Sequence, residues 1–555
     1  MINRKYFILL LSQICLFLLF NYLWENESFL FLYHESLNHV NLMIKISSNP
    51  LCIFSDNPFS YPIGVHYITK LVAFFFDDIK WPLFIVQTFF VTVNVIATYF
   101  CTLKITGKER AGFWAASALL WLPSAMVACR TFNLDYPLAA VLSLWILCYL
   151  YSEGLKRKVY VVWFFLLFLA MGMIKYSFVL YVAPCIAVML YELRKDRRKL
   201  ALFLFIIVGG LAVFLIYLSI ASNLNLFKYI HANIFSFRLS DRVRPADENM
   251  LEYMSLMFRG WLLELKAKVL TPAMFWLFCI SFTAIFYYPK RRKKYLLMFL
   301  PCALSLFFIL FTENDARYQY PLLSFFCITA SVFWSKRTWL LVSSFLVFFL
   351  QGIVMTGGWL FLDKNVPIDN CDDKYLYSDL DSSVISDYDL THRIMVNNNN
   401  KIAIEFSPDN TLTNLFNFDS AWSHGFFYTI DPHDTNWEEL FSFLTRIPDG
   451  STIVVVNADP HQNHNLLMNL PHFFAYWTEF HADLFGKDNI VFSNNSSHFK
   501  NTDTPDYILQ YELSLQKTGR RKRTSKDVAL SEKLQKERKL LKVIDSNYYV
   551  LRLYK

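Results

Sequence analysis

Long apolar runs alternate with short polar segments over the first two-thirds of the chain. Eleven runs carry no charged residue, and most are long enough to cross roughly 30 Å of hydrocarbon as α-helices. They occupy residues 6–23, 81–103, 111–129, 136–152, 159–174, 176–191, 200–222, 269–288, 295–312, 318–335 and 338–362. The pattern predicts an all-α polytopic membrane bundle with about 11 transmembrane helices.

Lysine and arginine cluster in every second gap between these runs. The clusters lie at residues 3–5, 104–110, 156–158, 194–199, 289–294 and 336–337. Because short loops rich in Lys and Arg stay in the cytoplasm, we expect a cytoplasmic N-terminus and an external segment after residue 362. The first run is longer than a signal-peptide core and no small-residue cleavage site follows it, so we expect an uncleaved anchor.

The chain divides into a membrane domain at residues 1–362 and an external domain at residues 363–555. A first external loop at 24–80 contains two apolar stretches, 36–46 and 61–76, that predict helices lying on the membrane surface. A second external loop follows at 223–268. In the external domain, strand patterns at 401–406, 452–457, 490–493 and 548–553, a helical stretch at 437–444 and a basic helical or disordered segment at 519–542 indicate an α/β fold.

Composition agrees with a membrane protein. Hydrophobic residues make up 55% of the chain, which excludes an ordinary soluble protein. The net charge of +8 comes largely from the short basic loops, so we expect membrane lipids as partners and no nucleic acid. Most of the ten cysteines lie in apolar runs, and Cys52 and Cys371 are an external pair that could form a disulfide. No metal-ligand spacing and no phosphate-binding glycine loop is present.

Three ionisable residues stand at predicted external ends of the apolar runs. Asp135 precedes Tyr-Pro and is either a helix N-cap or a functional carboxylate. Lys175 either extends its ammonium to the membrane surface or holds a phosphate there. Arg317 either pairs with Asp315 or contributes to the same site.

The first external loop adds acidic residues at the same side of the membrane. They are Glu25, Glu27, Glu35 and Asp56, and any one of them could be a solvated loop acid. Carboxylates can accept a proton, and cations such as Arg130 and Lys175 can stabilise a departing phosphate oxygen. The combination is suited to moving a group from a lipid phosphate.

The order of the motifs resembles the GT-C glycosyltransferases over residues 1–340. The motifs are a Tyr61-Pro62 segment, Arg130-x4-Asp135-x-Pro-Leu, Gly172-x-x-Lys175 and Arg317-Tyr318-x-x-Pro-Leu. They look most like those of the dolichyl-phosphate-mannose protein mannosyltransferases and the aminoarabinose lipid A transferases, within glycosyltransferase family 39. The resemblance implies an enzyme that transfers a hexosyl or pentosyl group from a polyprenyl-phosphate donor to a lipid, glycan or protein acceptor at the outer face.

The resemblance also implies roles for particular residues. Glu35 matches the catalytic carboxylate, although His34-Glu35 stands where the family usually has Asp-Glu, and Asp56 is the alternative base. Asp135 matches a second catalytic carboxylate. Substrate-binding positions are Arg130, Lys175, Arg317 and Tyr318, with Lys175 and Arg317 at the lipid phosphate. No cofactor is required, and a divalent metal is compatible with such a site.

Two other functions fit the same pattern. A transporter or flippase for lipid-linked sugars is also polytopic, and a noncatalytic protein could use the bundle only to anchor a binding domain. Because no retention or transit signal is present, we expect a bacterial plasma (inner) membrane, although N-glycosylation patterns such as 494–496 occur in the external segments.

Overall fold

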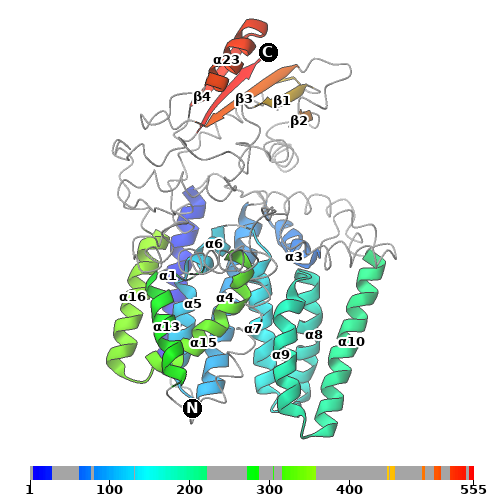
Figure 1. The fold of residues 1–555 in the computed structure, drawn as a ribbon, viewed down its shortest axis with the longest axis vertical. Helices are drawn as coiled ribbons and strands as arrows, with labels where there is room; N and C mark the ends of the chain where they lie inside the picture. Colours follow the sequence, from blue (N-terminus) through cyan, green and yellow to red (C-terminus); the bar gives the residue numbers. More distant parts are fainter. Residues whose placement is uncertain are drawn as a thin grey trace, which may run out of the picture.

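The computed structural model describes residues 4–27, 62–76, 80–130, 132–221, 265, 270, 272–286, 304, 316–357, 447–448, 451–456, 491–493, 506–513, 525–545 and 549–555. A bundle of helices forms one part of the molecule, and a sheet with one helix lies beyond the end of the bundle opposite to the N-terminus (Figure 1).

The bundle helices follow the apolar runs closely. They are α1 (Arg4–Glu27), α4 (Lys80–Thr106), α5 (Glu109–Leu120), α6 (Pro123–Arg130), α7 (Asp135–Tyr151), α8 (Lys158–Ile174), α9 (Phe178–Leu193), α10 (Arg197–Ala221), α13 (Pro272–Phe286), η4 (Ala316–Leu322), α15 (Leu323–Trp334) and α16 (Thr338–Gly357). The apolar runs therefore predict the helices well. The run at 295–312 lies outside the described residues except for residue 304.

Two of the predicted spans are not single α-helices. The run at 111–129 is divided between α5 and α6, which meet at an angle of 53°. Proline at position 123 starts α6, and a proline lacks the N–H that would continue the preceding helix. The run at 318–335 begins as the 3-10 helix η4 and continues as α15.

Helix length supports fewer complete spans than the sequence pattern does. Among the described residues, three helices are long and apolar enough to cross a membrane, or four when α5 and α6 count as one bent span. Five further apolar helices are shorter, of 10–17 residues. These helices agree with an integral membrane protein. The number of eleven spans stays a prediction.

The basic gaps gather at one end of the bundle. Arg110, in the first turn of α5, donates to the Tyr6 hydroxyl of α1 at 3.0 Å and to Thr338 Oγ1 of α16 at 3.2 Å. Lys199, at the start of α10, lies close to Gly154 in the turn before α8. The common end fits the alternation of basic loops in the sequence, whereas the side of the membrane on which it lies stays a prediction.

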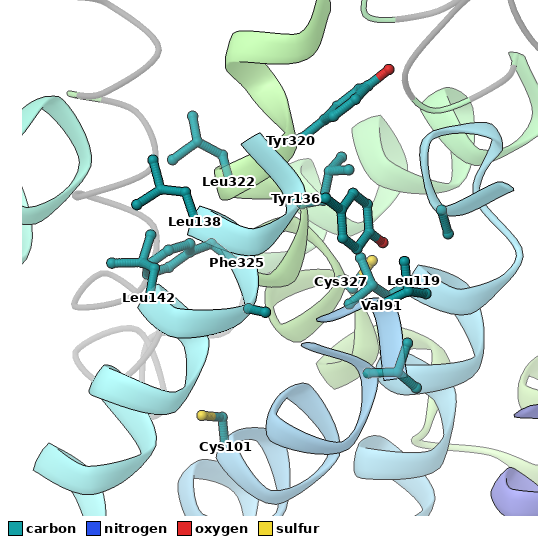
Figure 2. Packing of buried hydrophobic residues seen from close by; sticks show 14 of the residues in the cluster. Val91, Cys101, Leu119, Tyr136, Leu138, Leu142, Tyr320, Leu322, Phe325 and Cys327 are labelled. Carbon is teal, nitrogen blue, oxygen red and sulfur yellow. The ribbon is translucent and has the colours of Figure 1, made fainter. Parts of the chain in front are cut away.

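The centre of the bundle is built by α4, α5, α7 and α15. Apolar side chains from these helices and from η4 interdigitate there, and the Tyr136 ring points into this cluster (Figure 2). A polar cluster links three of these helices: Asn94 Oδ1 accepts hydrogen bonds from Ser143 Oγ at 2.7 Å and Ser324 Oγ at 2.9 Å. Buried hydrogen bonds of this kind help to fix the relative positions of α4, α7 and α15.

One helix of the first external loop is described. Helix α3 (Gly64–Ala73) confirms a helix within the predicted 61–76 stretch. Gly64 packs against the end of α8, where a Cβ atom would lie 2.7 Å from the Met173 carbonyl oxygen, so only glycine fits. Phe74 and Phe75, just after α3, are 87% and 79% exposed, as expected for a lipid-facing surface. The predicted helix at 36–46 lies outside the described residues.

The sheet has five strands in the order β2-β1-β3-β5-β4. They are β1 (Thr452–Val456), β2 (Val491–Ser493), β3 (Tyr507–Leu513), β4 (Leu540–Asp545) and β5 (Tyr549–Tyr554). Strand β1 is parallel to β2 and β3, whereas β5 is antiparallel to β3 and β4. Helix α23 (Ser525–Glu537) packs on β3, where Gln510 donates to Ser531 Oγ at 2.7 Å.

The sequence predictions for this region are partly confirmed. Strands β1, β2 and β5 coincide with predicted strands, and α23 is the helical form of the basic segment. That segment was predicted to extend to 542, which is wrong at its end, because β4 begins at Leu540 and pairs with β5. Strand β3 was not predicted. The predicted strand at 401–406 and the helical stretch at 437–444 lie outside the described residues.

Candidate active site

The turn before α7 sets the position of Asp135. Gln87 Nε2 of α4 donates to the Asn133 carbonyl at 2.8 Å, and Asn133 Oδ1 accepts the backbone N–H of Tyr136 at 3.1 Å. The cap hydrogen bond at this helix start thus comes from Asn133, and the N-cap interpretation of Asp135 is not the one the structure adopts. Asp135 is the first residue of α7 and is 2% exposed.

Asp135 forms a buried ion pair with Lys175. The Lys175 ammonium Nζ lies 2.8 Å from Asp135 Oδ1 and 2.9 Å from Oδ2. Lys175 follows the last turn of α8 in an extended conformation, and its backbone N–H is held by the Met171 carbonyl at 3.1 Å. With so little water around them the two charges attract each other strongly, but both have lost their hydration, and removing either partner leaves an uncompensated buried charge.

A tyrosine ring completes the environment of the ammonium. Lys175 Nζ lies 4.5 Å from the centre of the Tyr318 ring, within the range of a cation–π interaction. The Tyr318 carbonyl accepts the Tyr181 hydroxyl of α9 at 2.7 Å, which holds η4 in place. Three residues distant in sequence, Asp135, Lys175 and Tyr318, therefore meet at one end of α7, α8 and η4.

Arg130, at the end of α6, makes hydrogen bonds to α1 and α16. Its Nε donates to Asn21 Oδ1 of α1 at 2.8 Å, and its Nη2 donates to the Thr356 carbonyl of α16 at 2.6 Å. The Arg130 side chain is 4% exposed, and Glu25, which is 7% exposed, lies near enough to interact with it electrostatically. Arg130 thereby ties α6 to α1 and α16.

The remaining predicted site residues are only partly described. The backbone of Arg317 is part of η4, directly before Tyr318. Its side chain lies outside the described part of the structure. Glu35 and Asp56 lie outside the described residues altogether, as do Asp315 and both members of the suggested Cys52–Cys371 pair. The described residues contain no group of three His, Cys, Asp or Glu side chains that could hold a metal ion.

Sequence reasoning missed two buried polar residues, in α3 and in η4. Gln319 in η4 is fully buried, and His66 in α3 is fully buried with its ring 5.6 Å from that of Phe132. Each had a signal in the sequence: a lone polar residue in an apolar stretch. Such a signal is common in any membrane protein, and only the fold shows that His66 packs against Phe132 and that the element carrying Gln319 contacts α7.

Known proteins share this architecture. Residues 60–220, which include α3, Asp135 and Lys175, match the family model described as dolichyl-phosphate-mannose-protein mannosyltransferase. ArnT from Cupriavidus metallidurans in the apo state superimposes with a TM-score of 0.55 at 12% sequence identity, covering 100% of this chain and 98% of that chain. The same enzyme bound to undecaprenyl phosphate gives a TM-score of 0.58 at 13% identity, covering 99% of this chain and 98% of that chain.

The chain has the GT-C fold. The predicted resemblance to GT-C glycosyltransferases is therefore confirmed, and the segment matched by the family model contains both Asp135 and Lys175. No curated protein sequence matches the chain. At 12–13% identity the solved structures establish the fold, and the activity has to be argued from the site.

Proposed function

We propose that this GT-C protein is an integral membrane glycosyltransferase that moves a sugar from a polyprenyl-phosphate donor to a lipid, glycan or protein acceptor at the outer face of a bacterial plasma membrane. The observation that carries this proposal is the Lys175 ammonium, buried between the Asp135 carboxylate and the Tyr318 ring. It lies at the end of the bundle opposite to the basic loops, within the part of the chain that matches the mannosyltransferase family.

The ion pair would prepare a cation for the lipid phosphate. Asp135 balances the positive charge of Lys175 in a site with little water, and the bidentate contact fixes the direction of the ammonium. In this role Asp135 is a positioning residue that acts through Lys175. Arg317, one residue before Tyr318, would supply the second positive charge as the phosphate departs.

The reaction would be a single displacement at the anomeric carbon. A carboxylate takes the proton from the acceptor hydroxyl while its oxygen forms the new bond to the anomeric carbon. The bond from that carbon to the phosphate oxygen breaks, and its electron pair remains on the phosphate. This displacement inverts the anomeric centre. Glu35, with Asp56 as the alternative, is the proposed base; a divalent metal is compatible with the mechanism and is not needed for any step.

The proposal is tested by transfer with the purified full-length protein in lipid nanodiscs. A panel of radiolabelled polyprenyl-phosphate sugars is offered with a membrane extract as acceptor, and transfer by Lys175→Met is compared with wild type. A lost charged contact at the leaving phosphate should lower the rate about 30-fold to 1000-fold. The matched control is Arg157→Met, which removes an exposed cation at the other end of the bundle and should keep the wild-type rate.

Three outcomes contradict the proposal in different ways. Movement of intact lipid-linked sugar across a vesicle membrane without transfer would identify a flippase. Binding of a donor without turnover under any acceptor condition would favour a noncatalytic protein. Equal rates in Lys175→Met and wild type would remove the ion pair from the mechanism.

A further inference from the structure

Gln319, the neighbour of Tyr318, has hydrogen-bonding groups without partners. The side chain is fully buried, and among the described residues neither Nε2 nor Oε1 of its amide has a hydrogen-bond partner. Exchanging the amide oxygen and nitrogen would not help, because both atoms lack a partner. Buried polar groups in folded proteins are nearly always paired, so an amide unpaired at both atoms requires an explanation.

Two more amides, at the turn before α7, have unused hydrogen-bonding capacity. Asn133 uses Oδ1 to cap α7, but its Nδ2 is buried and without a partner in the described part of the chain. Gln87 donates from Nε2 to the Asn133 carbonyl, while its Oε1 has no partner within the same part. Unused donors and acceptors thus occur on the elements that position Asp135 and Tyr318.

The element that carries Gln319 packs directly on the start of α7. The rings of Tyr320 and Tyr136 lie 6.1 Å apart at an angle of 63°, and α7 and η4 are in contact along this turn. Element η4 is a seven-residue 3-10 helix that includes Pro321. Runs of 3-10 helix this long are uncommon and often mark functional hinges, because their hydrogen bonds are weaker than those of an α-helix.

We infer that Gln319, assisted by Asn133, binds hydroxyl groups of the donor's sugar. This inference rests on the proposed function. A carboxamide offers both donors and an acceptor, and a sugar hydroxyl both donates and accepts, so one hydroxyl pair can satisfy Nε2 and Oε1 together. The donor's phosphate has only acceptors and would leave Oε1 unpaired, and its hydrocarbon chain has neither. Sugar reaches the buried amide through a displacement of η4.

The test separates the sugar from the lipid phosphate. Full-length protein in phosphatidylcholine nanodiscs is titrated with undecaprenyl phosphate and with undecaprenyl phosphate carrying glucose, mannose or galactose. Wild type should bind at least one sugar-bearing lipid more tightly than the bare lipid. Gln319→Leu should weaken binding of that sugar-bearing lipid about tenfold, with unchanged affinity for undecaprenyl phosphate and no loss of thermal stability.

Gln13→Leu is the matched control. Gln13 is also a buried glutamine, but its Oε1 accepts the Trp121 indole N–H at 3.0 Å between α1 and α5. This variant should lose thermal stability and keep the wild-type ratio of the two affinities.

Each remaining outcome has one meaning. An unchanged ratio in Gln319→Leu, or equal weakening of both lipids, overturns the sugar contact even if wild type transfers sugar and the proposed function stands. Wild type that neither binds nor transfers any sugar-bearing lipid overturns the proposed function and this inference with it.

Discussion

Arg130 and Lys175 are two buried cations at the same end of the bundle, and they are held in different ways. Arg130 donates to the Asn21 amide and the Thr356 carbonyl, with the buried Glu25 close enough to interact electrostatically, and thereby joins three helices. Lys175 contacts both oxygens of the Asp135 carboxylate and a tyrosine ring. The planar guanidinium suits a fixed clamp with several directed hydrogen bonds, whereas a compact ammonium can turn toward an incoming anion. The comparison suggests that Arg130 stabilises the bundle and Lys175 serves the chemistry.

The largest effect is expected when the Asp135 carboxylate is removed. Asp135→Asn leaves Lys175 buried without its counter-charge, which should lower the free energy of unfolding by about 3 to 5 kcal/mol and abolish transfer. Thermal unfolding in nanodiscs and the transfer assay measure the two effects. Adding Lys175→Met to Asp135→Asn should restore part of the stability and none of the transfer; recovery of transfer in the double variant would contradict the role of the pair.

Removing the Arg130 side chain should lower the stability of the bundle more than it lowers donor affinity. Arg130→Met loses charge-assisted hydrogen bonds to α1 and α16, at a cost of about 1.5 to 3 kcal/mol in stability. Donor affinity should change less than about threefold, because the contacts seen join helices. A fall in donor affinity as large as that of Lys175→Met, with unchanged thermal stability, would instead make Arg130 a substrate-binding residue, as its sequence position predicts.

The tyrosine ring tests a smaller part of the Lys175 environment. Tyr318→Leu removes the ring beneath the ammonium and should cost about 0.5 to 2 kcal/mol, with a weaker affinity for undecaprenyl phosphate. Tyr318→Phe keeps the ring and should behave like wild type. Binding titrations of both variants provide the measurement, and an equal loss in both would assign the effect to the hydroxyl rather than the ring.

The smallest effect is expected for an exposed ion pair at the opposite end. Arg157 and Glu153 form an i,i+4 pair with about half of each side chain exposed. Glu153→Gln should change stability by less than about 0.5 kcal/mol, because water and salt screen such pairs. Thermal unfolding at low and high salt tests this; a loss approaching that of Asp135→Asn would remove burial as the reason for the difference.

The sequence predicted the helices more securely than the sheet. Charge-free runs of sufficient length determine where helices begin and end in a membrane bundle, since every backbone group must be paired within its own helix. The basic loops likewise predicted which loops lie at the same end of the bundle. The contacts of Arg110 with α1 and α16 agree with this prediction. Strand β3 and the start of β4 were missed because strand pairing depends on partners far along the chain.

The site was predicted as a set of residue types, and the tertiary structure decided how they are used. Sequence order and motif spacing singled out Asp135, Lys175 and Tyr318, but no spacing rule reveals that a carboxylate and an ammonium 40 positions apart form a pair. The same rules grouped Arg130 with Lys175, and only the packing of α1, α6 and α16 shows that its hydrogen bonds join helices. Gln319 could not be singled out from the sequence for a related reason: whether a polar group lacks a partner depends on every residue packed around it. Local sequence thus determines which segments enter the membrane and which chemical groups are available, whereas pairing, burial and unused hydrogen-bonding capacity are properties of the assembled bundle.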